Sequence, residues 1–209
     1  MRDDFPRAIL FDVFGTVVDW RGSLIEELSA FGAARGIAGD WTTLVDRWRG
    51  NYVPSMDRVR RGELPWTRLD DLHRASLDEL VTELGIAGLT EDDRAHLTRA
   101  WHRLRPWPDV VAGLTRLKRR YIIGTLSNGN FSLLANLAKH AGLPWDVVIG
   151  GDLLRHYKPD KEVYRAADAY PGTACSPRPR SISAARFIAA RPTAPATRWR
   201  SRASPPAPT

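Results

Sequence analysis

The chain has 209 residues, of which 43% are hydrophobic and 26% charged, a balance typical of soluble globular proteins. No stretch approaches the roughly 20 consecutive apolar residues of a membrane span, and the first residues lack the apolar run of a secretory signal. The single cysteine, Cys175, excludes a disulfide framework within the chain and a cysteine-based zinc cluster. We therefore expect a cytoplasmic protein without a membrane partner.

The formal net charge of +7 comes from the C-terminal segment. Residues 171–209 contain seven arginines and no acidic side chain, whereas residues 1–170 contain 24 basic and 24 acidic side chains. Because this body is neutral, no nucleic-acid partner is expected. Ala, Pro, Arg, Ser and Thr make up 33 of the 39 residues of the segment, which predicts a disordered basic tail. The alternative is that a shifted reading frame in GC-rich DNA produced it.

Three short apolar runs without a polar face, over residues 8–11, 121–126 and 147–149, predict strands buried on both sides. Apolar stripes at helical spacing predict helices over 110–117 and 133–141, and a further helix opens after Pro159. Strands that alternate with helices predict a parallel sheet with right-handed crossovers, so the fold class is α/β with a Rossmann-like core.

Residues 20–105 show helical stripes, over 41–48, 69–84 and 90–104, and no convincing strand. Thr90 and Asp93 form a cap-like start for the last of these helices. We therefore expect an α/β core of residues 1–19 and 106–170, interrupted after its first strand by an all-helical insert of residues 20–105.

Polar side chains follow each predicted strand. Asp12 follows the first, Ser127 and Asn128 follow the second, and Lys158 lies in the loop after the third. Each alone is an ordinary turn or cap residue, but parallel sheets bind ligands beyond the carboxyl ends of their strands. An aspartate beside a lysine ammonium stays ionised, and Thr16 can bond the same group. Such a carboxylate can attack an electrophilic carbon or phosphorus and form a covalent intermediate.

These residues lie in three motifs, 11–16 (FDVFGT), 126–129 (LSNG) and 157–160 (YKPD). Together they resemble the motifs of the haloacid dehalogenase superfamily, and most closely those of its type II branch, the L-2-haloacid or (S)-2-haloacid dehalogenases. The resemblance covers residues 7–170. It implies a Rossmann-like core with a helical cap over the active site, and often a homodimer.

Phe14 separates two chemistries of this superfamily. Its phosphatases carry a second aspartate at this position, which protonates the leaving group and helps to hold Mg²⁺. An aromatic ring can do neither, but it can line an apolar wall for a small alkyl substrate. We therefore favour carbon–halogen chemistry without a cofactor over the alternative of a magnesium-dependent phosphatase.

The resemblance implies a role for each matched residue. Asp12 displaces halide from C2 of a small (S)-2-haloalkanoic acid and leaves an ester on the enzyme. The groups that position Asp12 and the substrate carboxylate are Thr16, Ser127 and Lys158. Arg49 and Asn128 receive the halide, Tyr164 supports the site, and the candidate pocket walls are Val13, Phe14 and Trp20. From the residues alone, Arg49 is a surface arginine and Tyr164 a half-buried helix aromatic. The five histidines are expected to be structural or exposed, and no metal ligand is expected.

The family's fourth motif supplies an aspartate that activates water to hydrolyse the ester, on the strand after the helix that contains Tyr164. This chain has no Asp or Glu after Asp168, and no apolar run there resembles that strand. We therefore expect the C-terminal strand to be missing and the hydrolysis step to be impaired. The alternatives are an inactive truncated family member and a basic-tail protein that binds polyanions.

Overall fold

The computed structural model describes residues 8–169. At its centre, β1 (Ala8–Phe11) pairs in parallel with β4 (Ile122–Thr125), with Leu10 opposite Gly124. The predicted third strand is reduced to a single parallel bridge between Gly124 and Val147, although the Thr125 amide also donates to the Val147 carbonyl at 3.1 Å. A Cβ on Gly124 would lie 2.7 Å from that carbonyl oxygen, so glycine is what allows this close approach.

Four helices surround the sheet: α6 (Val110–Lys118), α7 (Phe131–Ala141), α8 (Gly151–Leu154) and α9 (Lys161–Ala169). The helices predicted over 110–117, 133–141 and after Pro159 correspond to α6, α7 and α9. Helix α7 ends where Gly142 adopts a left-handed conformation, with φ of 64°. The α/β class and the parallel pairing are thus confirmed.

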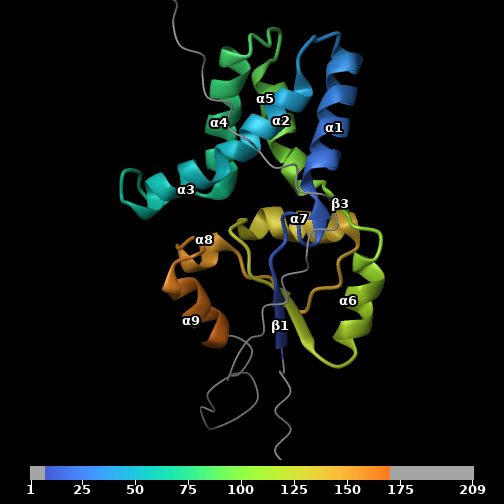
Figure 1. The fold of residues 1–209 in the computed structure, drawn as a ribbon, viewed down its shortest axis with the longest axis vertical. Coiled ribbons are helices and arrows are strands. Elements are labelled where there is room, and N and C mark those ends of the chain that lie inside the picture. The colour runs from blue at the N-terminus through green and yellow to red at the C-terminus, as the bar shows by residue number, and fades with distance from the viewer. Residues whose placement is uncertain (1–7, 170–209) are drawn as a thin grey trace, which may run out of the picture.

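A layer of helices lies on the other side of α7 (Figure 1). This helical layer consists of α1 (Trp20–Arg35), α2 (Trp41–Gly50), α3 (Tyr52–Arg60), α4 (Leu69–Glu83), α5 (Glu91–Thr98) and the 3-10 helix η1 (Arg99–His102). The predicted helix over 90–104 begins at the expected Thr90–Asp93 capping box but tightens into η1 at Arg99. The layer occupies the predicted insert, whose status as a separate domain stays a prediction.

The chain enters and leaves the helical layer through two short strands that pair with each other. In β2 (Val18–Asp19) and β3 (Arg105–Pro106), Val18 lies opposite Pro106 and Asp19 opposite Arg105, in antiparallel orientation. The Asp19 side chain also accepts the Gly22 amide at 2.9 Å and caps the start of α1. The two crossings between the layers are therefore one paired ribbon.

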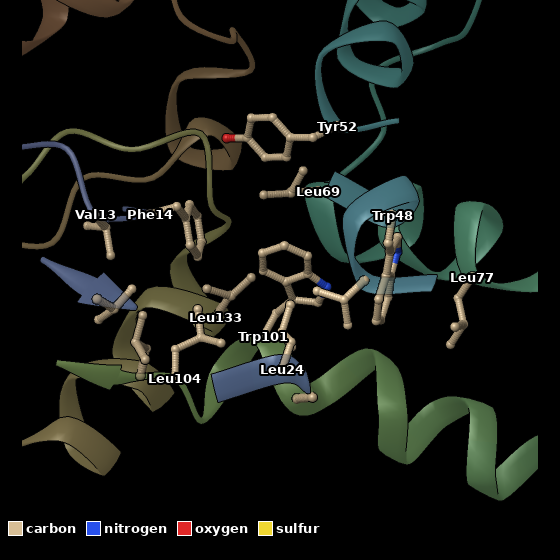
Figure 2. Packing of buried hydrophobic residues seen from close by; sticks show 14 of the residues in the cluster. Val13, Phe14, Leu24, Trp48, Tyr52, Leu69, Leu77, Trp101, Leu104 and Leu133 are labelled. Atoms are coloured by element: carbon tan, nitrogen blue, oxygen red, sulfur yellow. The ribbon is translucent and has the colours of Figure 1, made fainter. Parts of the chain in front are cut away.

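The main hydrophobic core spans both layers. Trp48 and Trp101 are fully buried in it, and Figure 2 shows Phe14 from the sheet side facing Trp101. The Phe14 and Trp101 rings meet edge to face with centroids 5.9 Å apart. Because this core is shared, the packing that stabilises the helical layer also fixes Phe14 beside the strand end.

His73 is buried among these aromatic rings. It stacks on Trp101 with ring centroids 4.3 Å apart, and neither ring nitrogen has a hydrogen-bond partner among the described residues. Burial lowers the pKa of His73 from 6.5 to about 3; the charge of Asp70 opposes this, and that of Arg49 adds to it. The sequence predicts that the five histidines are structural or exposed. His73 is structural: it is a neutral residue of the core.

This histidine should make the protein less stable in acid. Between pH 6.5 and about 3 the unfolded chain binds a proton that folded His73 excludes, so stability is lost as the pH falls through that window. From pH 7 to 5 we expect wild-type protein to lose about 2 kcal/mol more than His73→Phe in the free energy of unfolding. Urea denaturation at both pH values measures this. Equal losses in the two proteins would show that His73 is not the group that titrates.

No helix within residues 8–169 is both long and apolar enough to cross a membrane. The predictions of a disordered basic tail, a shifted reading frame and a missing C-terminal strand concern residues 170–209, which lie outside the described residues.

Candidate active site

Asp12 directly follows β1 and is held by two side chains. The Lys158 Nζ donates to Asp12 Oδ1 at 2.7 Å, and the Thr16 hydroxyl donates to Oδ2 at 3.3 Å. The Asp12 side chain is 43% exposed and that of Lys158 only 18%. A carboxylate that is oriented yet accessible can act as a nucleophile.

Ser127 and Asn128 lie at the same edge of the sheet because the two strands end in register. The Leu126 amide donates to the Phe11 carbonyl at 2.8 Å, so the residues that follow, Asp12 and Ser127, leave adjacent strands. Asn128 is buried, and its side-chain oxygen accepts the Lys158 amide at 2.7 Å. This bond joins the loop after β4 to the loop that carries the Lys158 ammonium.

The wall beside Asp12 is aromatic. Val13 and Phe14 are both buried, and the Phe14 ring lies edge-on to Tyr52 with centroids 6.5 Å apart. Trp20 stacks on Trp101 at 6.4 Å. Val13 and Phe14 thus follow Asp12 as buried apolar neighbours, and Phe14 and Trp20 both pack on Trp101.

Magnesium would need oxygen ligands at this position. Phe14 supplies no side-chain oxygen, and within residues 8–169 no three His, Cys, Asp or Glu side chains gather as a metal site. Among the described residues, Asp12 therefore lacks the second carboxylate that Phe14 replaces.

Arg49 comes from the last turn of α2 in the helical layer. Its guanidinium carbon lies 4.1 Å from the centre of the Tyr52 ring and 5.4 Å from that of Trp20. Its Nη1 is buried without a hydrogen-bond partner among the described residues. The interpretation of Arg49 as a surface arginine is therefore wrong, because a half-buried guanidinium with an unused donor is ready to bind an anion.

Tyr52 is a site residue that sequence reasoning missed. It is buried at the start of α3, where its ring lies under the Arg49 guanidinium. Burial raises the pKa of this hydroxyl from 10.0 to about 12. The signal in the sequence was its spacing, three residues after Arg49, which is about one helical turn.

Tyr164 lies on α9, half-buried against a second apolar cluster that includes Leu10, Leu126 and Ile149. This cluster packs beside the sheet. The supporting role predicted for Tyr164 stays a prediction.

Polar contacts fasten the helical layer over this edge of the sheet. His102 Nε2 lies 3.2 Å from the Asp70 carboxylate, and the Asn130 side-chain amide donates to Asp70 at 2.9 Å. Burial alone would raise the pKa of Asp70, but these hydrogen bonds and the His102 charge lower it. On the other flank, the Tyr157 hydroxyl donates to the Thr67 carbonyl at 2.7 Å. These contacts therefore hold the helical layer against the edge of the sheet that carries Asp12.

Residues 6–167 match the model of the haloacid dehalogenase-like hydrolase family. The chain belongs to this family. It is 31% identical over 183 residues to (S)-2-haloacid dehalogenase 1 of Pseudomonas sp. strain CBS-3, an alignment that covers 81% of this chain and 74% of that enzyme. It is 29% identical to the (S)-2-haloacid dehalogenase of Xanthobacter autotrophicus over 79% of this chain, and spans 63% of that enzyme's length.

Solved structures of dehalogenase-like hydrolases share the fold. The L-2-haloacid dehalogenase PA0810 superposes with a TM-score of 0.76 at 53% identity, covering 79% of this chain and 70% of that one. The Xanthobacter enzyme with chloropropionic acid covalently bound superposes with a TM-score of 0.68 at 26% identity, covering 79% and 64%. These relatives confirm the predicted family and its type II branch.

Proposed function

We propose that this protein attacks small (S)-2-haloalkanoic acids, with Asp12 as the nucleophile that displaces halide from C2. One observation carries the proposal: an accessible carboxylate, held by Lys158 at 2.7 Å, adjoins the aromatic wall of Phe14. A small acid with an apolar carbon fits such a pair of surfaces. The covalently bound chloropropionic acid in the Xanthobacter relative supports the same chemistry.

In the first step, an Asp12 oxygen forms a bond to C2 from the face opposite the halogen, while the carbon–halogen bond breaks and its electron pair leaves with the halide. Thr16 and Lys158 hold the Asp12 carboxylate in line for this attack. Ser127 and Lys158 are the groups we assign to the substrate carboxylate. The unused donor of Arg49 and the Asn128 amide receive the halide.

In the second step, water must hydrolyse the ester on Asp12, and a base must take its proton. The side chains that hold Asp12 are Lys158 and Thr16, and neither is a carboxylate that could take this proton. A phosphatase reaction is not favoured, because Phe14 can neither protonate a leaving group nor ligate a metal.

Release of chloride from the two enantiomers of 2-chloropropionate tests this function. The first burst of chloride should be at least about 100-fold faster with the (S) enantiomer, since only one configuration places the halogen opposite Asp12. Magnesium-dependent phosphate release from an aryl phosphate serves as the control reaction. Phosphate release without any chloride burst would refute the dehalogenase function.

We also infer that this reaction takes place in the cytoplasm, needs no added cofactor and is carried out by a homodimer. The chloride burst should therefore be unchanged after treatment with EDTA and dialysis. Sedimentation of the purified protein measures its assembly. A burst that is lost with EDTA and restored by a metal would contradict this part of the proposal.

A further inference from the structure

Tyr52 occupies the point where the helical layer meets the reacting edge of the sheet. Arg49 from α2, Asn128 from the loop after β4 and the charge of Asp12 all act on the pKa of its hydroxyl. The ring is buried against Phe14 and the Arg49 guanidinium. Tyr52 is therefore placed between the nucleophile and the two residues that we assign to the halide.

The polar groups near the Tyr52 hydroxyl are donors. The Asn128 oxygen accepts the Lys158 amide at 2.7 Å, and the Asn128 NH₂ group can only donate. A guanidinium can only donate as well. Toward these two donors the Tyr52 oxygen can act only as an acceptor, so its O–H remains available to a further acceptor.

An anion suits the surroundings of Tyr52 as the acceptor of its O–H. Burial keeps Tyr52 protonated far above neutral pH, because its pKa is raised to about 12. The neighbouring Arg49 Nη1 is buried and has no partner among the described residues. Two donors, one of them cationic, therefore lie on the same side of the site, while the Lys158 ammonium is bound to Asp12.

We propose that Tyr52 determines leaving-group specificity by donating its O–H to the departing halide, and so favours carbon–fluorine and carbon–chlorine over carbon–bromine substrates. This proposal rests on the proposed function. As the carbon–halogen bond breaks, its electron pair becomes the negative charge of the halide, and the Asp12 oxygen takes its place on C2. Tyr52 keeps its proton, because a halide ion is a much weaker base than a phenolate.

The preference follows from ion size. A hydrogen bond to an anion strengthens as the charge becomes more concentrated, so fluoride gains most from a neutral O–H and bromide least. The Arg49 guanidinium and the Asn128 amide are still present in Tyr52→Phe. A change in the ranking of the leaving groups between wild type and this variant therefore reports on the hydroxyl of Tyr52.

The test compares Tyr52→Phe with wild type on the (S) enantiomers of 2-fluoro-, 2-chloro- and 2-bromopropionate. The measured quantity is the rate of the first burst of halide, which requires only the ester-forming step. We expect Tyr52→Phe to slow fluoride release about 10-fold or more and bromide release less than about threefold, with chloride between them. Tyr121→Phe is the matched control, since Tyr121 precedes β4 at the opposite end of the strand.

Each outcome decides the proposal. A graded loss in Tyr52→Phe alone supports it. An equal loss for all three halides, or none, overturns it while leaving the dehalogenase function intact, because wild type still releases halide. A wild-type protein that releases no halide from any substrate overturns both. Thermal unfolding of the variants identifies a fold defect, and Tyr52→Leu, which removes ring and hydroxyl, should reproduce the graded loss if it folds.

Discussion

Asp12→Asn is expected to reduce halide release by a factor of about 10⁴ or more, to the level of the reaction without enzyme. An amide oxygen carries no full charge and is a poor nucleophile, while its size leaves the surrounding packing unchanged. The contact with Lys158 at 2.7 Å would become a hydrogen bond to a neutral oxygen. Chloride release from (S)-2-chloropropionate, followed with a chloride electrode, measures the effect.

The matched control is Asp46→Asn. Asp46 is an exposed residue on α2 that pairs with Arg21 at 2.7 Å. Its substitution makes the same chemical change to a surface ion pair, so chloride release should stay within about twofold of wild type. If Asp12→Asn retained the wild-type rate, another residue would have to be the nucleophile.

We expect wild-type protein to stop after one turnover, with the ester still attached to Asp12. The ester-forming step uses residues that the structure brings together, but ester hydrolysis needs a base to activate water. No Asp or Glu follows Asp168, so residues 169–209 cannot supply a carboxylate for that purpose. Intact-mass measurement after incubation with 2-chloropropionate should show one added propionate unit per chain and one equivalent of chloride.

Asp12→Asn gives the blank for this measurement, because it should acquire no adduct. Peptide mapping should place the wild-type adduct within residues 8–19. Chloride that accumulates well beyond one equivalent per chain, with no adduct left on the protein, would show that the ester is hydrolysed and would contradict the single turnover.

The arrangement of Asp12, Ser127, Asn128 and Lys158 could be predicted because each follows a run of apolar residues. Parallel strands bring their carboxyl ends to one edge, so the order of the motifs along the chain was enough to predict a shared site. The third run, over 147–149, follows the same rule but forms only one bridge. An apolar run predicts burial more reliably than it predicts continuous strand pairing.

The contribution of the helical layer was harder to predict. Arg49 and Tyr52 reach the site from helices whose tertiary position no local pattern specifies, and only the family resemblance pointed to Arg49. The pairing of His102 with Asp70 joins residues 32 positions apart, and neither has a neighbour in sequence that indicates the other. Such contacts depend on how two layers meet, whereas periodicity describes one element at a time.

The paired ribbon of β2 and β3 restricts how substrate can gain entry. Since both crossings of the chain are bonded to each other, we expect the helices above to move as a unit about that ribbon. Such a movement would have to break the contacts of Asp70 and Tyr157 and to separate the core that both layers share. Substitutions of Asp70 or Tyr157 should therefore change how fast substrate reaches Asp12, without changing the positions of the reacting groups.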